Sequence, residues 1–508
     1  MPLFDKLGFF GHPFAKTNAD EEPDLFRYFI PPPYFDAVVG DPDIPSASVV
    51  LAPRGAGKTA LRCMVEVEAS KFDVLAITYD RFEFSATDKV SEIGLQYHLR
   101  NIITRILIAY LTYLSENQAA TKALSKEEKK RLGAFVSTYL GELTNENLQE
   151  LLSELRSIPE KLKKFWSENV GFMDSVVNFV LKNYDLEGID LPTVKQEEKK
   201  LSETYKHQLE LLLNFVRSVG FKSIYILIDR VDETEQTGND AEATYQLIKP
   251  IIRDLDLLGL PGYGFKFFLW DKIEPYYKKD ARPDRVSQYT LNWTREGLKQ
   301  VLSKRTKAFS SGTISGLNEL LSKPARVDID NVIAVLSNSS PRNLIRFCEL
   351  TLARQAERDP ESKNIELRSF DFATTSFAEI VVGEIYGDVI AKDLQKVGRE
   401  LFTTNYIAND VFKISSQGAR NKITSWMNTG IVQMVGTVTV DGSKKPVNFY
   451  CVIEPAAVRL IHRPIDIETF IMDRWLPCDH CDTDNLLDIE LYPGDNDAVC
   501  RRCGRKLV

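Results

Sequence analysis

Short apolar runs alternate along this chain with segments whose apolar residues recur every three or four positions. The short runs predict buried strands, and the helical spacing predicts amphipathic helices between them. The predicted strands cover Ser48–Leu51, Phe72–Tyr79, Ser223–Ile228 and Phe265–Leu269. The predicted helices begin at Gly57 or cover Thr204–Val219 and Ala241–Leu257. Because strands and helices alternate, the pattern predicts an α/β fold with a parallel sheet that helices cover.

A long helical stretch interrupts this alternation from about residue 88 to residue 203. It exceeds what one crossover between strands requires, so we predict a helical insertion in a core domain of residues 46–292. Its longest apolar run, Ile102–Leu114, contains Arg105 and is shorter than the roughly 18 residues that a membrane helix needs. The chain starts without a basic segment followed by an apolar one. We therefore expect a cytoplasmic protein with no membrane partner.

The rest of the pattern predicts four further modules. In one of them, two β-rich runs, Gly430–Val440 and Val447–Ile453, are joined by Asp441-Gly442, which is a hairpin signal. Short helices before such a hairpin are typical of a winged helix. The modules are an irregular N-terminal arm packed on the next domain (1–45), a helical lid (293–370), a winged-helix-like domain (371–470) and a small cysteine-bearing module (471–508).

Composition narrows the class of protein. The chain has 508 residues, of which 44% are hydrophobic and 27% charged, with a net charge of −8. These values fit a globular protein with a sizeable core and exclude a strongly basic nucleic-acid coat, although not a local basic patch. Four of the seven cysteines gather near the C-terminus, which favours a metal site over a disulfide framework.

The segment from Ala52 to Thr59 predicts a phosphate-binding loop. Gly55 and Gly57 allow backbone N–H groups to turn toward phosphate oxygens, and the following helix points its positive end at the same anion. Lys58 would reach the β- and γ-phosphates, and the Thr59 hydroxyl would bind Mg²⁺. We predict ATP with Mg²⁺ as the ligand. The predicted contact residues are Arg54, Gly55, Ala56, Gly57, Lys58, Thr59 and Ala60.

A P-loop needs an acidic partner at the end of a neighbouring strand. Asp229 follows the strand Ser223–Ile228 and would hold Mg²⁺. Arg230 occupies the next position, so either Asp232 or Glu233 would orient the attacking water, or hydrolysis is slow. The alternative is that Asp232 and Glu233 only cap the next helix.

These motifs resemble those of known signalling ATPases. Asp229-x-Val-Asp232-Glu233 resembles the Walker B motif of NACHT-type STAND ATPases, relatives of AAA+ proteins. Ser340-Pro-Arg342 is similar to the lid motif of Orc/Cdc6-like and STAND proteins, although Ser339 stands where these families usually have Gly. The resemblance implies that Arg342 is a sensor of the γ-phosphate and that Pro341 starts a lid helix.

Two further features concern the same resemblance. The run from His12 to Ala19 resembles a segment of uncharacterised bacterial P-loop ATPases, which implies a place near the adenine pocket. Arg282 or Arg285 would act as an arginine finger on a neighbouring subunit, or would simply lie in a solvated turn. Bacterial STAND-like proteins often belong to anti-phage or stress systems, so the resemblance implies a defence role.

Two Cys-x-x-Cys pairs separated by 18 residues predict a zinc ribbon. Four thiolates close the coordination sphere of Zn²⁺, so the metal would be structural, and iron is a minor alternative. His480, inside the first pair, is predicted to be a bystander. Basic residues would give the module a cationic surface: Arg501, Arg502, Arg505 and Lys506. The predicted zinc ligands are Cys478, Cys481, Cys500 and Cys503.

The segment 415–427 would be the second helix of a helix-turn-helix. DNA contacts there would come from Gln417, Arg420, Asn421 and Lys422, with Lys444 and Lys445 on the wing tip. Ile423, Trp426 and Ile431 would belong to the core. The alternative is a winged helix that packs on the nucleotide domain or binds protein.

Three functions follow from these features. The first is an ATP-driven switch that controls homo-oligomerisation or engagement of a partner protein. The second is a DNA-binding, initiator-like ATPase that uses the winged helix and the zinc ribbon. The third is an adaptor that binds a nucleotide without turnover.

Overall fold

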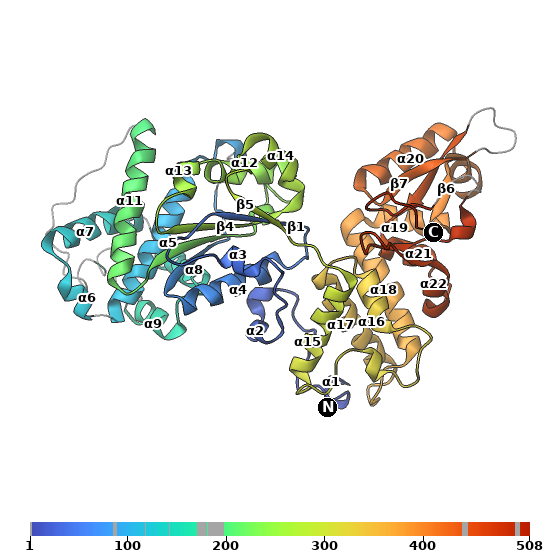
Figure 1. Ribbon diagram of the computed structural model, residues 1–508. Helices are drawn as coiled ribbons and strands as arrows, with labels where there is room; N and C mark the ends of the chain where they lie inside the picture. The colour runs from blue at the N-terminus through green and yellow to red at the C-terminus, as the bar shows by residue number, and fades with distance from the viewer. Residues whose placement is uncertain are drawn as a thin grey trace. The chain divides into compact units, whose positions relative to one another are not determined.

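The computed structural model describes residues 3–84, 89–116, 118–141, 143–169, 180, 198–438, 446–492 and 498–507. The described chain divides into two compact units. The first, here called the sheet unit, comprises Pro31–Arg54 and Lys58–Leu291. The second, here called the helical unit, comprises Met1–Ile30, Gly55–Gly57 and Asn292–Val508. Figure 1 labels the elements of both.

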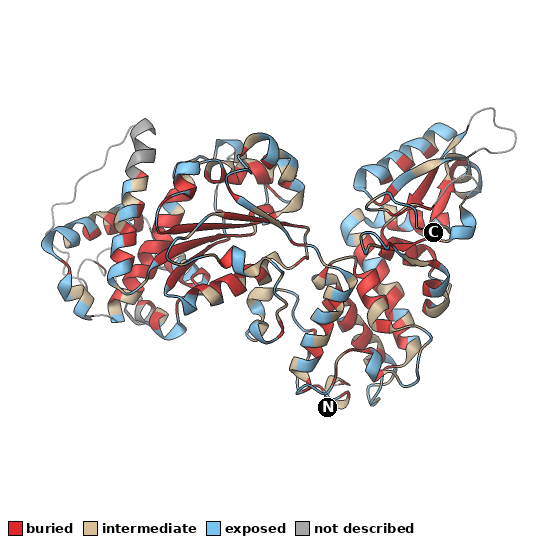
Figure 2. Ribbon diagram, in the orientation of Figure 1, coloured by how far each residue is buried: buried red, intermediate tan, exposed pale blue. Residues whose placement is uncertain are grey.

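A five-stranded parallel sheet forms the centre of the sheet unit, in the order β2-β3-β4-β1-β5. Four of its strands are those that the apolar runs predict, and β5 was not predicted because its sequence, Ser-Gln-Tyr-Thr, is polar and lies at the sheet edge. Figure 2 shows the central strands buried along their length. The strands are β1 (Ser48–Ala52), β2 (Val74–Tyr79), β3 (Ser223–Ile228), β4 (Tyr263–Trp270) and β5 (Ser287–Thr290).

Helices cover both faces of this sheet, so the predicted α/β class is confirmed (Figure 1). Helices α3 and α4 lie on one face, and α12 and α13 lie on the other. The region predicted as an insertion consists mainly of helices where it is described, and α5 packs on α11 in the main apolar core. These helices are α3 (Phe35–Val39), α4 (Lys58–Lys71), α5 (Leu95–Glu116), α6 (Gln118–Ala123), α7 (Lys126–Leu140), α8 (Asn145–Glu154), α9 (Glu160–Asn169), α11 (Glu198–Ser218), α12 (Ala241–Ile252), α13 (Leu255–Leu258) and α14 (Glu274–Asp280).

The helical unit has its own apolar core, in which Phe347 stacks on Phe370 and Phe377. Its first helices follow the predicted lid, and α17 begins at Pro341 as predicted. The predicted boundary between residues 370 and 371 falls inside α18. The helices are α15 (Arg295–Phe309), α16 (Ile329–Leu336), α17 (Pro341–Arg358), α18 (Leu367–Tyr386), α19 (Asp388–Val397), α20 (Ser416–Thr429), α21 (Pro455–Ile461) and α22 (Ile467–Arg474).

The N-terminal arm belongs to both units and is not wholly irregular. It contains short helices: α1 (Leu3–Lys6), α2 (Leu25–Tyr28) and α3. Phe9 and Phe14 are buried in the core of the helical unit, and Glu22 pairs with Arg305 of α15. The expectation that the arm packs on the next domain is therefore wrong for its first 30 residues. Apolar side chains in an aperiodic segment show that it is buried, but they do not identify the surface that buries it.

A three-stranded antiparallel sheet in the order β6-β8-β7 follows α19. It confirms the predicted hairpin, and its strands are β6 (Leu401–Thr403), β7 (Val432–Val438) and β8 (Val447–Val452). Ile423, Trp426 and Ile431 are buried, as predicted for core residues. The predicted turn at Asp441-Gly442 lies outside the described residues. Among the helices that the structure describes, none combines the length and the apolar character that crossing a membrane requires.

Candidate nucleotide and metal sites

The predicted P-loop leaves β1 and enters α4 at Lys58. Gly55 and Gly57 have backbone φ values of 80° and 94°, which residues other than glycine rarely adopt. The two glycines therefore allow a loop shape that few other residues would permit. The loop lies at the carboxyl edge of the parallel sheet, where ligands of such sheets bind.

Lys58 turns its ammonium group back over this loop. Its Nζ lies 3.3 Å from the carbonyl oxygen of Ala52 and 3.4 Å from that of Pro53. Burial lowers the pKa of Lys58, while the nearby carboxylates of Asp232 and Asp229 raise it in part. The amine is therefore partly desolvated and has acidic neighbours, and an incoming phosphate would strongly favour its charged form.

Asp229 follows β3 and is wholly buried beside the start of α4. Its Oδ1 accepts a hydrogen bond from the N–H of Arg230 at 2.9 Å, whereas Oδ2 has no hydrogen-bond partner among the described residues. Burial raises the pKa of Asp229, and Arg62, Lys58 and the hydroxyl of Thr59 lower it in part. A buried carboxylate oxygen that has no hydrogen-bond partner among the described residues, next to a threonine hydroxyl, provides oxygen donors of the kind that Mg²⁺ prefers. The residues thus fit a magnesium ion with a bound nucleotide.

Two residues of this site were missed in the sequence. Arg62 of α4 is fully buried, and its Nε lies 3.4 Å from Oδ2 of Asp229. Asp271 follows β4, burial raises its pKa, and its Oδ1 has no hydrogen-bond partner in the part of the chain that the structure describes. An arginine one helical turn after the P-loop lysine and an acid at the end of a strand were the available signals. Neither points to the site until the strand order places β3 and β4 side by side.

Asp232 and Glu233, the two candidates for a catalytic base, have different surroundings. Arg54 donates from Nε to Oδ2 of Asp232 at 2.8 Å and from NH2 to its backbone oxygen at 2.8 Å. Arg54, predicted to contact the nucleotide, therefore holds Asp232 and also lies over the ring of Trp270. Glu233 is exposed and lies 3.7 Å from Arg230. Glu233 is the more accessible of the two carboxylates.

Arg230 has a left-handed backbone, with φ of 58°. Its guanidinium lies 3.9 Å from the carboxylate of Asp80, a residue that follows β2 and also pairs with Arg156 at 3.2 Å. Both the strand end and the helical insertion are therefore tied to the segment that follows Asp229.

Three further arginines were predicted for the nucleotide site, and one of them contacts the predicted P-loop: the N–H of Arg342 donates to the carbonyl oxygen of Gly55 at 3.2 Å, and both residues belong to the helical unit. Arg282 and Arg285 are exposed and contact Asp284 between them, which is the arrangement of a solvated turn. Arg342 lies in the first turn of α17, in the helical unit, and is exposed. The roles of arginine finger and sensor stay predictions.

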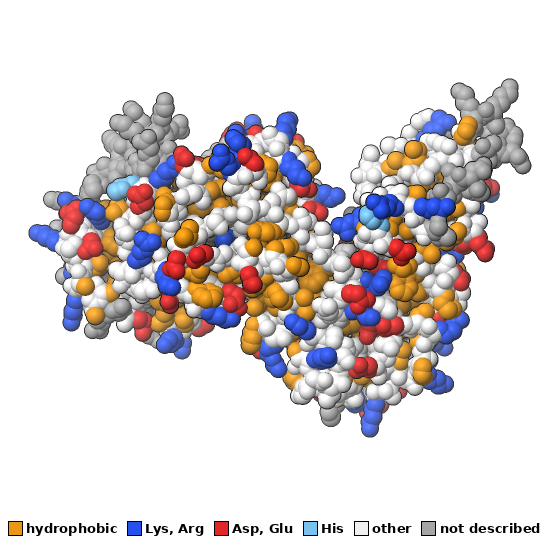
Figure 3. Space-filling model, in the orientation of Figure 1, with side chains coloured by type: hydrophobic (Ala, Val, Ile, Leu, Met, Phe, Trp, Pro, Cys, Tyr) orange, Lys and Arg blue, Asp and Glu red, His pale blue; other side chains and the backbone are white. Residues whose placement is uncertain are grey.

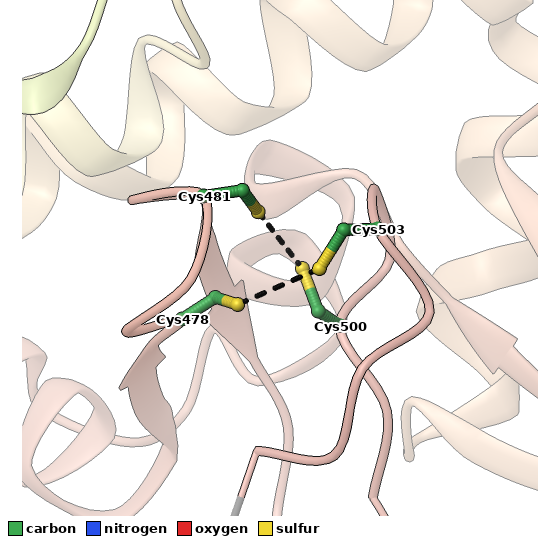
Figure 4. A group of neighbouring side chains, drawn as sticks. All are labelled: Cys478, Cys481, Cys500 and Cys503. Carbon is green, nitrogen blue, oxygen red and sulfur yellow. Dashed lines mark hydrogen bonds between the residues drawn. The ribbon is translucent and has the colours of Figure 1, made fainter.

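Four cysteines come together at the C-terminus of the helical unit, and their sulfur atoms all lie within 4.8 Å of one another. The sulfur of Cys478 is 3.7 Å from that of Cys503, and Cys481 is 3.6 Å from Cys500. Tetrahedral Zn²⁺ with bonds of about 2.3 Å would separate its sulfur ligands by about 3.8 Å. Figure 4 shows the four thiols pointing toward one another, so the predicted cluster fits zinc.

The two cysteine pairs have the same local fold. The N–H of Asp482 donates to the carbonyl of Cys478, and the N–H of Gly504 donates to that of Cys500, both at 2.9 Å. Asp482 and Gly504 both have positive φ, as a tight turn after each pair requires. Two short strands, β9 (Trp475–Pro477) and β10 (Asp484–Leu486), support the first turn. His480 is exposed and outside the cluster, which agrees with its prediction as a bystander.

The predicted basic surfaces are only partly available. Gln417, Arg420 and Asn421 are exposed on α20, but Lys422 pairs with Asp393 and lies over the ring of Phe412. Lys444 and Lys445 lie outside the described residues. In the predicted zinc ribbon, the side chains of Arg502, Arg505 and Lys506 are exposed. The Arg501 side chain instead donates a hydrogen bond to Asn338. On the face drawn in Figure 3, described Lys and Arg side chains are mixed with Asp and Glu.

Comparisons with known proteins add little to this geometry. No protein-family model matches the sequence, and a search of curated proteins finds no match. The chain is similar to a solved structure of the Aeropyrum pernix ORC1 protein in complex with DNA, at 12% identity and a TM-score of 0.35. The match covers 88% of this chain and 96% of that one. This score carries no conclusion about fold or function, so both rest on the residues and topology above.

Proposed function

We propose that this chain binds ATP with Mg²⁺, hydrolyses it slowly, and uses the bound nucleotide as a switch for self-assembly or for engagement of a partner protein. The observation that carries the proposal is the buried Oδ2 of Asp229, which has no hydrogen-bond partner among the described residues, beside Thr59 and Lys58 at the start of α4. Lys58 would contact the phosphates, while Thr59 and Asp229 would hold the metal. The metal would neutralise charge on the phosphates when bound.

Slow turnover is inferred from the residues around Asp229. Arg230 stands where many AAA+ ATPases have a catalytic Glu, and Asp232 is held by Arg54. Of the carboxylates of Asp229, Asp232 and Glu233, only that of Glu233 is exposed. We therefore assign to Glu233 the orientation of the attacking water, and expect a rate that depends on how well this side chain reaches the γ-phosphate.

The nucleotide site is tested by calorimetric titration with an ATP analogue and Mg²⁺. In Lys58→Ala, the loss of a charged donor should weaken binding about 10- to 100-fold. Lys71→Ala is the matched control, because Lys71 is exposed at the other end of α4 and pairs with Glu68. Equal binding by wild type and Lys58→Ala would overturn the site assignment.

The switch is tested by mass measurement with and without the analogue. We expect the wild type to change its oligomeric state or its partner binding with nucleotide, and Arg342→Ala to bind nucleotide without that change. A monodisperse species that is unaffected by nucleotide would favour the adaptor function instead. A role in anti-phage or stress defence stays a prediction from the resemblance.

DNA binding is a second candidate function, favoured by the exposed Gln417, Arg420 and Asn421 on one helix. In a salt-titrated binding assay, Arg420→Ala should weaken binding and reduce the salt slope by about one. Arg463→Ala is the control, because Arg463 is exposed outside α20. Binding that is insensitive to Arg420→Ala would exclude α20 as the reader.

A further inference from the structure

The second cysteine pair contains an arginine whose side chain is bonded inside the helical unit. The guanidinium of Arg501 donates to Oδ1 of Asn338 at 2.8 Å, to the carbonyl of Ile453 at 2.9 Å and to the carbonyl of Asp484 at 3.0 Å. All three of its nitrogens are therefore used. Arg502, the next residue, is exposed, so of the two arginines in the Cys500–Cys503 turn only Arg501 points into the helical unit.

Asn338 receives this contact in a strained loop. Asn338 and Ser339 have φ values of 45° and 61°, two consecutive left-handed residues that are not glycine. Such a conformation persists only where surrounding contacts hold it. The Asn338 amide is held at both ends, because its Nδ2 donates to Oε2 of the buried Glu454 at 2.7 Å while its Oδ1 accepts from Arg501.

Helix α17 begins immediately after this loop. Ser340 caps it by accepting the N–H of Asn343 at 3.2 Å, Pro341 occupies the first position, and Arg342 follows in the first turn. Since a cap and a fixed loop set the direction in which a helix starts, the place of the Arg342 side chain depends on Asn338.

We infer that Arg501 is a positioning residue that couples the zinc-binding turn to the first turn of α17. Zinc bound by Cys500 and Cys503 would fix the backbone on both sides of Arg501, and the guanidinium would in turn hold Asn338 and the start of α17. The proposed effect of Arg501 on the order of the Asn338–Ser339 loop depends only on these contacts. An effect on ATP rests on the proposed function, because it requires Arg342 to act as a sensor.

Hydrogen exchange of the full-length protein tests the coupling. The reporters are the amides of Ser340 and Asn343, which donate to Ser337 and to the Ser340 hydroxyl. Asn338→Gly removes the amide that Arg501 holds and should speed their exchange about 10- to 100-fold, the range for losing a charged hydrogen bond. Ser339→Gly is the matched control, because it adds the same flexibility and keeps the contact with Arg501. Zinc content should stay that of the wild type in both variants.

A second arm approaches the same contact from the metal. Removing zinc with a chelator, or the change Arg501→Lys, should speed exchange at the same amides, with the middle of α17 as an internal reference. Arg502→Ala should leave exchange unchanged. The inference would be overturned if Asn338→Gly and Ser339→Gly exchanged at equal rates. It would also be overturned if the exchange rates of the Ser340 and Asn343 amides did not change when zinc is removed.

The two proposals fail in different ways. If exchange rises in Asn338→Gly while the nucleotide-dependent change in oligomeric state or partner binding is unchanged, the positioning by Arg501 stands and the sensor role of Arg342 is refuted. If Lys58→Ala binds ATP as well as wild type does, the nucleotide site falls and the exchange result still decides the role of Arg501.

Discussion

Asp232 and Glu233 are neighbours in the chain whose side chains have opposite surroundings. Asp232 is buried under Arg54, and Glu233 is exposed at the surface. This difference separates a structural acid from a candidate catalytic one, although the sequence treats both as equivalent.

The two acids should therefore respond differently to neutralisation. Asp232→Asn should lower the free energy of unfolding by about 1–3 kcal/mol, because it weakens a charged hydrogen bond that is largely buried. Glu233→Gln should leave stability unchanged and reduce ATP turnover about 100-fold, with nucleotide affinity preserved. Urea unfolding and steady-state hydrolysis measure the two effects.

Glu235→Gln serves as the control for Glu233, because Glu235 is exposed two residues later. A turnover that falls in Asp232→Asn and not in Glu233→Gln would reassign the water-orienting role to Asp232.

Lys266 is a buried lysine in the middle of β4. Its Nζ donates to the carbonyl of Ser46 at 2.8 Å and lies over the ring of Tyr225, and burial lowers its pKa to about 8 from 10.5. The folded state thus releases this proton at a lower pH than the unfolded state, so stability rises as pH increases from about 8 to 10.5.

We predict that the free energy of unfolding of the wild type rises by up to about 3 kcal/mol relative to that of Lys266→Met across this pH window, because each pKa unit corresponds to about 1.4 kcal/mol. Below pH 8 the difference between the two proteins should be constant. Denaturation curves of the sheet unit at several pH values measure it. A difference that does not change with pH would show that the pKa of Lys266 is the same in the folded and the unfolded protein, which would contradict the prediction.

At the scale of elements, α20 is held by one face. Trp426 on that face is buried, and its ring packs edge-on against Phe402, at 6.0 Å between ring centres. The other face of the helix carries Gln417, Arg420 and Asn421. One helix thus provides both a packed contact and a candidate recognition surface.

Trp426→Ala should lower the free energy of unfolding by about 3–5 kcal/mol, because it removes a large buried side chain and leaves a cavity. Met427→Ala is the control, since Met427 is partly exposed on the same helix. Urea unfolding followed by circular dichroism would measure both. Equal, small effects would mean that α20 does not pack as described.

At the scale of the whole molecule, the two units have separate apolar cores. The thiol cluster belongs to the helical unit, and Lys266 belongs to the sheet unit. Perturbations at these two places should therefore act on different parts of the unfolding curve.

We expect two calorimetric transitions. Chelation of zinc or the change Cys500→Ser should lower the midpoint temperature of the helical unit's transition alone, because zinc contributes its binding energy to the folding of the ribbon. Lys266→Met should shift only the other transition. His480→Ala, in the first cysteine turn, should shift neither. A single transition that moves as one in all variants would contradict independent unfolding of the units.

The elements that the sequence predicted best are those with a strong local signal. Ser223–Ile228 is a strand with the predicted bounds, because the five consecutive apolar residues after Ser223 favour burial along the whole segment. Gly55, Gly57 and the paired cysteines were recognised from turn chemistry, which depends on a few adjacent residues. β5 and the first 30 residues were misjudged, since an edge strand can be polar and a buried arm carries no period.

The sequence by itself determined the parallel α/β core, the glycine loop between β1 and α4, the hairpin and the four clustered cysteines, because each follows from residue types at short spacing. Only the tertiary structure decided that Arg54 holds Asp232, that Arg62 lies beside Asp229 and Asp271 near Lys58, and that Arg501 turns inward to Asn338. These pairings connect residues up to 178 positions apart at the nucleotide site and 163 apart at the ribbon. Such contacts are set by strand order and packing, and local residue patterns contain no information on them.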